Sequence, residues 1–169
     1  MTDFTHLDAQ GRVRMVDVGE KKESKRVAVV MGSISMEAAT LNMILDERVK
    51  KGNVLEAARI AGVMAAKRTA DLIPMCHPLN ITYARVDFFP DIDQSKILIE
   101  AEVSLTGRTG VEMEAMTAVS VAALTIYDMC KSYDRGMRIS GIYLKSKSGG
   151  KSGTYMADPD PEADANSSQ

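Results

Sequence analysis

The feature that most constrains the fold is a stretch of sequence, residues 115–126, that contains no charged side chain. It reads AMTAVSVAALTI, and apolar side chains would fall on every side of a helix built from it. A helix that covers one face of a sheet normally keeps a polar stripe toward water, whereas a helix that is apolar all round is buried on all sides. One small domain can hardly enclose such a helix, so we expect a partner subunit to cover its outer face. A core helix wrapped within its own domain is the alternative.

Ionisable side chains flank this stretch, in a helix expected from about Glu112 to Lys131. Glu112 and Glu114 lie at its start, where the helix dipole favours acids, and Lys131 lies at its end, where the dipole favours bases. Asp128 does not fit this pattern, because an acid near a helix C-terminus is disfavoured. Asp128 and Lys131 are three residues apart on one helical face, which indicates a pair kept for chemistry.

The two charged ends of this helix are too far apart to meet one substrate within one chain. At 1.5 Å per residue, Glu114 and Asp128 would be roughly 20 Å apart along a straight helix. A two-fold axis between antiparallel copies of the helix would bring Glu114 of one chain near Asp128 of the other. The sequence therefore predicts active sites shared between subunits.

The order of secondary structure elements predicts the fold class. Alternating or β-branched runs predict strands at 27–34, 80–88, 96–105 and 138–145, and helical spacing predicts helices at 37–48, 54–70 and 112–131. The order β-α-α-β-β-α-β is that of a ferredoxin-like fold with a doubled first helix. We predict an oligomeric α+β protein with a ferredoxin-like antiparallel sheet and helices packed on one face. Residues 1–24 would form a partly flexible N-terminal segment, 25–153 one catalytic domain ending in a glycine- and lysine-rich loop, and 154–169 a disordered acidic tail.

Composition excludes several classes of function. The chain has 169 residues, of which 45% are hydrophobic and 26% charged, as in ordinary soluble domains. Its 21 basic and 23 acidic residues leave no basic excess, so nucleic acid is not an expected partner. No apolar run approaches the ~20 residues of a membrane helix, and no signal peptide is recognisable. The two cysteines, Cys76 and Cys130, form no metal-type CxxC pair, and we expect a reduced, cytoplasmic protein.

A loop between two prolines, Pro74 and Pro78, contains Met75, Cys76 and His77. Histidine is the usual acid–base group near neutral pH, although a lone loop histidine is more often structural. Cys76 beside it could be a thiol nucleophile or a metal ligand. No further Cys/His cluster exists, which disfavours both roles.

A second loop, residues 145–153, reads KSKSGGKSG and combines glycine, hydroxyl groups and lysine. Glycine lets backbone N–H groups approach an anion, and lysines such as Lys147 neutralise it. Lys145 stands where a P-loop needs its first glycine and no helix follows, so this is not a P-loop. We expect the loop to close over a bound anion, with a solvated tail as the alternative. Lys51 and Lys67 could add to the same anionic pocket.

Three strings, LIPMCHPL (72–79), TGVEMEAMTAVSVAALTIYDMCK (109–131) and LKSKSGGKSG (144–153), closely resemble the MoaC family, the cyclic pyranopterin monophosphate synthases of molybdenum cofactor biosynthesis. The resemblance runs from about residue 13 to residue 153. It implies a hexamer built as a trimer of dimers, with active sites at the dimer interface. It also implies that the chain is a lyase whose substrate, 3′,8-cyclo-7,8-dihydro-GTP, is made by a radical SAM enzyme and converted to cyclic pyranopterin monophosphate with release of pyrophosphate.

The resemblance also implies roles for individual residues. It implies that Asp128 is catalytic, with Lys131 essential beside it. The substrate contacts that it implies are Met75, Cys76, His77, Met113 and Glu114, with family lysines around the pocket at Lys51, Lys67 and Lys147. From the residues themselves, we expect Glu112 to be a further substrate-binding residue and, with His77 and Glu114, to supply an acid or base for the proton transfers.

No cofactor is expected, because ring rearrangement needs proton transfers and no hydride carrier; Mg²⁺ assisting the triphosphate stays open. Two other interpretations also stay open. One is a non-catalytic ligand-binding regulator, because ferredoxin-like dimers often bind small molecules between subunits. The other is a metal-dependent nucleotide cyclohydrolase that uses Cys76, His77 and a glutamate.

Overall fold

Buried and more exposed side chains alternate along two neighbouring strands of the sheet, β1 (Ser24–Ser35) and β3 (Lys96–Gly107). The computed structural model describes residues 10–151 and 153–158. In β3, every second residue from Ile97 to Leu105 is buried, and Glu100 and Glu102 lie on the other face. β1 alternates in the same way from Ala28 to Ile34. A strand with period-two alternation buries one face and leaves the other to water or to a partner.

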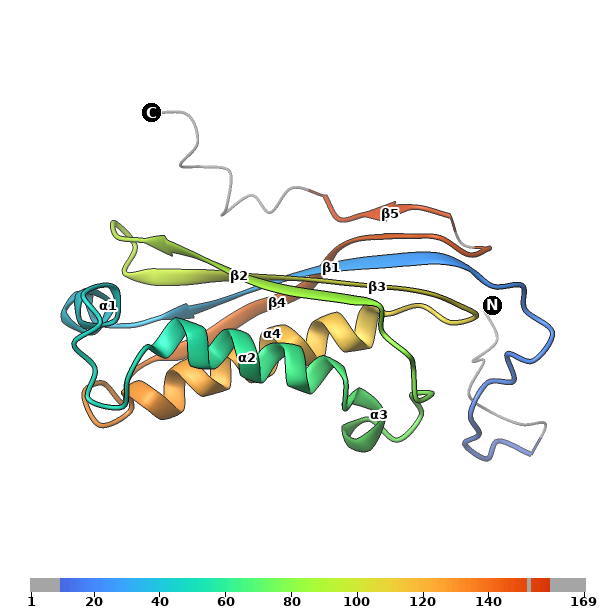
Figure 1. Ribbon diagram of the computed structural model, residues 1–169, viewed down its shortest axis with the longest axis horizontal. Coiled ribbons are helices and arrows are strands. Elements are labelled where there is room, and N and C mark those ends of the chain that lie inside the picture. The colour runs from blue at the N-terminus through green and yellow to red at the C-terminus, as the bar shows by residue number, and fades with distance from the viewer. Residues whose placement is uncertain (1–9, 152, 159–169) are drawn as a thin grey trace.

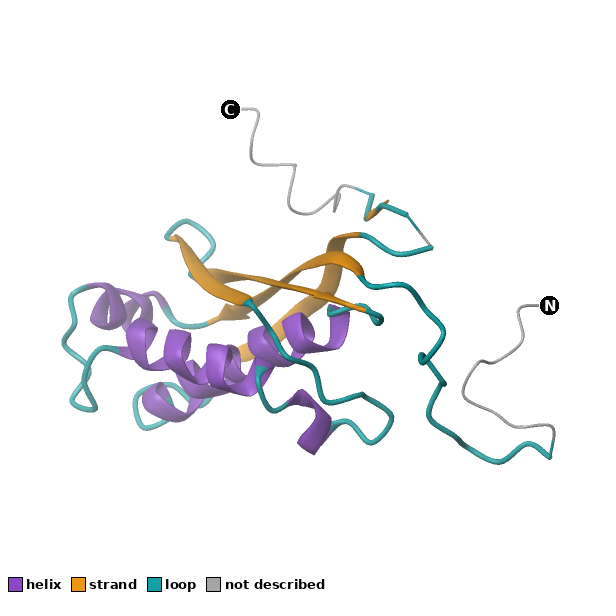
Figure 2. Ribbon diagram, turned by 45° about the vertical axis from the view of Figure 1, so that its right-hand side comes forward, coloured by secondary structure: helices purple, strands orange, loops and turns teal. Residues whose placement is uncertain are grey.

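The sheet has five antiparallel strands in the order β2-β3-β1-β4-β5. β2 (Tyr83–Asp91) forms one edge, and β4 (Arg138–Ser148) lies on the other side of β1. β1 and β3 pair along their whole lengths. All the long helices lie on one face of this sheet (Figures 1 and 2). The prediction of an α+β protein with helices on one face of an antiparallel sheet is confirmed.

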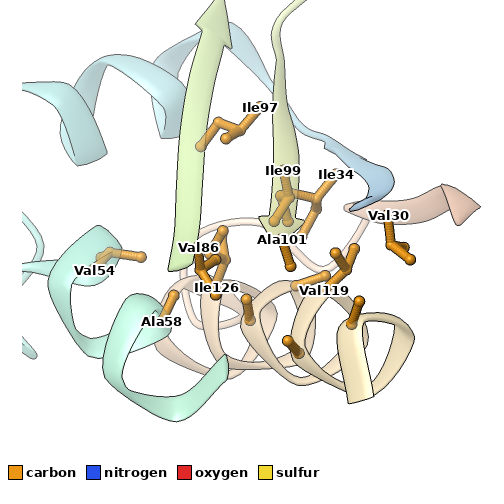
Figure 3. Close-up of a cluster of buried hydrophobic side chains, with 14 of the residues drawn as sticks. Val30, Ile34, Val54, Ala58, Val86, Ile97, Ile99, Ala101, Val119 and Ile126 are labelled. Carbon is orange, nitrogen blue, oxygen red and sulfur yellow. The ribbon is translucent and has the colours of Figure 1, made fainter. Parts of the chain in front are cut away.

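Two helices, α2 (Val54–Ala66) and α4 (Glu112–Cys130), cover the sheet. Asn53 begins α2, because its side chain accepts a hydrogen bond from the Glu56 backbone N–H at 3.0 Å. The helices approach closely at Gly62, where an added Cβ would lie 2.9 Å from the Ala118 carbonyl oxygen. Side chains from both helices and from three strands point toward one another in the core (Figure 3).

The apolar helix α4 is half enclosed by its own subunit. Ala118, Val119 and Ile126 are fully buried against the sheet, whereas Leu124 is 56% exposed on the outer side. Among the described residues, one helix, α4, is long and apolar enough to suit a membrane span, with a mean hydropathy of 1.2. By length and composition, the expectation that no apolar run approaches a membrane helix is therefore wrong. Because 56% of that stretch is buried inside the subunit, α4 is a core helix.

The remaining elements differ from the predicted ones mainly at their ends. The helix predicted at 37–48 is α1 (Ala38–Leu45), and the one predicted at 54–70 divides into α2 and the short α3 (Thr69–Leu72). The Thr69 hydroxyl donates to the carbonyl oxygens of Ala65 and Ala66 at 3.4 and 3.1 Å, which satisfies the end of α2 and permits the break.

Part of the predicted acidic tail is ordered along the sheet edge. Residues of β5 (Tyr155–Met156) pair with β4. The rest of that tail, 159–169, and the first part of the predicted N-terminal segment, 1–9, lie outside the described residues.

Candidate active site

A cavity of about 840 Å³ opens at the N-terminal end of α4. Four parts of the chain form its walls: the segment before β1, the loop between the two prolines, the start of α4 with the turn before it, and the glycine turn after β4. In Figure 1 the segment before β1 forms the right-hand end of the molecule, and α4 begins on the side facing it. The lining side chains that carry charge or can titrate are Glu20, Lys21, Lys22, Glu23, Arg26, Cys76, His77, Arg108, Glu112, Glu114 and Lys151.

The predicted substrate contacts Met75, Cys76, His77 and Met113 all line this cavity together with Glu114. Glu114 is only 3% exposed, and burial raises its pKa from 4.5 to about 7, against the opposing effect of its backbone hydrogen bond and with a small contribution from nearby Glu112. A carboxyl group with this pKa can both give and take a proton near neutral pH.

The thiol of Cys76 is poorly suited to nucleophilic attack. Burial, and then the charge of Glu114, raise its pKa above the ordinary value. A cysteine needs its thiolate form to react, so these neighbours keep it as a thiol. Within residues 10–151 and 153–158 of one chain, no three histidine, cysteine or acidic side chains lie together as metal ligands would.

Glu112 lines the cavity and forms an ion pair with Lys147. The Lys147 Nζ donates to Glu112 Oε1 at 2.8 Å, which ties β4 to the first turn of α4. Both side chains are about one-third exposed or less. Gly110 packs directly against the Glu112 carboxylate, and a Cβ at this position would overlap it. A side chain at this position would therefore have to displace the Glu112 carboxylate, which is the partner of Lys147.

The opposite end of α4 holds a second group of charges. Asp128 Oδ1 accepts from Lys131 Nζ at 2.6 Å, and Asp128 Oδ2 lies 3.5 Å from Lys51 Nζ. Lys51 also donates to the Asp128 backbone carbonyl at 2.8 Å, which satisfies one of the last carbonyls of the helix. The hydrogen bond and charge of Lys131, followed by the charge of Lys51, lower the pKa of Asp128, and Asp128 raises the pKa of Lys131. This arrangement is an ionised carboxylate between two ammonium groups.

Lys67 neither lines the main cavity nor belongs to the charged group around Asp128. It lines a smaller hollow of about 100 Å³ that shares Leu79 and Glu114 with the main cavity. The predicted site residues of one chain thus form two groups at opposite ends of α4. Lys51, Asp128 and Lys131 form one, and the others gather in or beside the main cavity.

Sequence reasoning missed Arg26, Arg108 and the segment before β1. Val16, Val18 and Lys21 of that segment line the cavity, although the sequence suggested a partly flexible arm. The available signal was the apolar patch at 13–18 followed by two lysines. This pattern alone does not show that the segment lines a cavity, because it is the pairing of β1 with β3 that brings the segment near the start of α4.

Comparison with known proteins gives a consistent result. The sequence model of the MoaC family matches residues 15–150. Three relatives are each named cyclic pyranopterin monophosphate synthase. The protein from Desulforapulum autotrophicum is 75% identical, over 94% of this chain and 97% of its own length. The proteins from Desulfatibacillum aliphaticivorans and Rhodospirillum rubrum are 61% and 56% identical, over 92% and 91% of this chain and 98% and 93% of their own lengths.

Proposed function

The chain belongs to the MoaC family, with the activity of a cyclic pyranopterin monophosphate synthase, a lyase of molybdenum cofactor biosynthesis, and we propose that its substrate is 3′,8-cyclo-7,8-dihydro-GTP. The observation that carries the proposal is the cavity at the start of α4, which places cationic side chains beside a buried carboxyl group. A triphosphate needs cations, and a ring rearrangement needs acids and bases.

The cations of the cavity have a defined task in this reaction. Lys21, Lys22, Arg26 and Lys151 offset the charge of the triphosphate. When a substrate hydroxyl oxygen bonds to the α-phosphorus, the bond from that phosphorus to the bridging oxygen breaks and pyrophosphate leaves. The hydroxyl proton passes to a base, and the cations stabilise the negative charge that develops on the leaving group.

Proton transfer during the ring rearrangement falls to the carboxylates and their neighbours. Glu114, with its raised pKa, and His77 act at the cavity end of α4. Asp128 and Lys131 exchange a proton with the substrate at the other end, where Lys51 holds the carboxylate in place. Groups with different pKa values in one site allow several steps to proceed at one pH.

We propose that these two groups meet across a dimer. The outer face of α2 and α4 leaves Ile60, Met64 and Leu124 at least half exposed, which is unusual for large apolar side chains on one face. Two such faces packed through a two-fold axis would bury them and bring Glu114 of one subunit toward Asp128 of the other. On this proposal the subunit is ferredoxin-like, one catalytic domain over 25–153, and assembles into a cytoplasmic hexamer as a trimer of dimers.

The activity is tested by incubating the purified protein with the cyclic dihydro-GTP and measuring pyrophosphate and the pterin product together. Asp128→Asn and Lys131→Ala should lose turnover while circular dichroism shows a folded protein. Asp46→Asn, which changes an exposed ion-paired carboxylate, is the matched control and should keep activity. A regulator would release no pyrophosphate in any variant, and a metal-dependent cyclohydrolase would lose activity on chelation.

The shared site is tested by mixing two inactive variants, Glu114→Ala and Asp128→Ala, under conditions that exchange subunits. In a mixed dimer one site carries both substitutions and the other carries neither, so random mixing should restore about a quarter of wild-type activity. If each site lay within one chain, mixing would restore nothing.

A further inference from the structure

Arg26, near the start of β1, joins that strand to the turn before α4. Its Nε donates to the Gly107 carbonyl at 2.9 Å, and its Nη2 donates to the Arg108 carbonyl at 3.0 Å. The glycine turn after β4 presses on the same guanidinium, since a Cβ on Gly150 would overlap it. The backbone at Arg108 is therefore held in place by its neighbours.

The side chain of Arg108 continues these contacts into the segment before β1. Its Nη1 donates to the Gly19 carbonyl at 3.0 Å, and its Nε lies 3.8 Å from Glu23 Oε1. The Gly19 carbonyl belongs to a turn that is itself well formed. Asp17 Oδ1 accepts from the Gly19 N–H at 2.8 Å, and the Lys21 N–H donates to the Val18 carbonyl at 3.1 Å.

Arginine suits this position better than lysine does. The planar guanidinium carries five N–H donors in a fixed fork, so one side chain can serve Gly19 and Glu23 together. A lysine is a point charge on a flexible stem and lacks this fixed geometry. Both Arg108 and Glu23 are substantially exposed, so the ion pair alone is weak, and the hydrogen bond to Gly19 is the more directional contact.

The segment that Arg108 holds supplies one wall of the cavity. Val16 and Val18 line it together with Lys21 and Lys22. Two cations fixed at the cavity before a polyanion arrives lose less conformational entropy on binding than two cations on a free arm. Holding the segment therefore strengthens binding of anionic groups without any contact between Arg108 and the substrate.

We propose that Arg108 is a positioning residue that holds residues 16–23 against the cavity, so that Lys21 and Lys22 are placed to bind the phosphate groups of the substrate. This inference rests on the proposed function for the identity of the substrate. The holding of the segment is a property of the protein alone.

The experiment compares Arg108→Gln and Arg108→Lys with wild type, with Lys96→Gln as the matched control. Lys96 is a cation at the opposite end of β3, bonded locally to Gln94. In the absence of substrate, trypsin should cleave after Lys21 and Lys22 several times faster in both Arg108 variants than in wild type or the control. Arg108→Gln should also raise KM about fivefold to tenfold while kcat changes less than twofold.

A double-mutant cycle separates positioning from direct contact. In a protein that already carries Lys21→Ala and Lys22→Ala, Arg108→Gln should have little further effect on KM, because the cations that it positions are gone. Independent, additive effects would overturn the proposal, as would wild-type cleavage rates in both Arg108 variants.

Failure of the proposed function would look different. If the proposed function is wrong, wild type will not turn over the cyclic dihydro-GTP, but the Arg108 variants will still be cleaved faster by trypsin. In that case the double-mutant cycle is repeated with the affinity for inorganic pyrophosphate, measured by calorimetry, in place of KM. Weaker pyrophosphate binding by Arg108→Gln supports the proposal, and unchanged binding overturns it.

Discussion

The buried carboxyl of Glu114 makes a quantitative prediction about stability and pH. Glu114 is 3% exposed, and its pKa rises from 4.5 to about 7 on folding, chiefly through burial. At about 1.4 kcal/mol per pKa unit, this rise corresponds to about 3 kcal/mol. Because the folded pKa is the higher one, the folded protein holds the proton more tightly, and stability falls as pH rises from 4.5 to about 7. Above that range the whole penalty is present.

Glu114→Gln removes this penalty, because glutamine is neutral at every pH. The variant loses whatever contacts the carboxyl makes at all pH values, so the comparison between two pH values isolates the ionisation. The free energy of unfolding of the variant minus that of wild type should be larger at pH 8 than at pH 5 by about 2 to 3 kcal/mol, which means that the variant gains stability over wild type at high pH. Urea unfolding of both proteins at the two pH values, at one protein concentration, measures this difference.

The matched control is Glu56→Gln, which neutralises an exposed carboxylate in the first turn of α2. It has no burial penalty to remove, so its effect should be nearly the same at pH 5 and pH 8. If Glu114→Gln also showed a pH-independent effect, the carboxyl would be ionised at little cost in the folded protein, and its assignment as an acid–base group near neutral pH would be wrong.

Three other perturbations test the packing, the charged pair and the assembly. Gly62→Ala should lower the urea midpoint, with a net loss of about 1 kcal/mol, because overpacking at the contact between α2 and α4 outweighs the better helix propensity of alanine; a raised midpoint would contradict the packing argument. In carboxyl ¹³C NMR titrations, Lys131→Gln should raise the pKa of Asp128 more than Lys51→Gln does, since Lys131 has the larger effect on it; the reverse order would exclude the observed pairing. Leu124→Glu should shift the sedimentation coefficient toward a smaller species, because it places a charge on the exposed apolar face of α4; an unchanged value would place the interface elsewhere.

Much of the architecture could be read from local patterns. The alternation in 96–105 predicted which side chains of β3 face the helices, and Ile97, Ile99 and Ala101 are fully buried as expected. The spacing of Glu114 and Asp128 predicted that their groups lie apart, and the structure assigns them to different ends of α4. These predictions succeeded because strand and helix periods are properties of the backbone that hold wherever the element lies.

Contacts between distant parts of the chain could not be read in this way. Arg26 bonds to the Gly107 and Arg108 carbonyls, residues that are 81 and 82 positions away, and Arg108 bonds to Gly19 across 89 positions. The environment of Glu114 is also a product of packing, because the sequence shows only an acid in the first turn of a helix. Its raised pKa depends on the segments that cover it.

The sequence by itself determined the order of the long elements, the charge-free helix with ionisable groups at both ends, and the motifs that carry the family resemblance; the short α3 and β5 were not predicted. Each of these depends on residues close to one another in the chain. Tertiary structure alone decided that the segment before β1 forms a wall of the cavity, that Arg108 reaches it, and that Glu114 is buried enough to change its pKa. The physical reason is that desolvation and long-range hydrogen bonds depend on which surfaces come into contact. The pairing of β1 with β3 brings the segment before β1 beside the turn before α4, and so determines these contacts at the site.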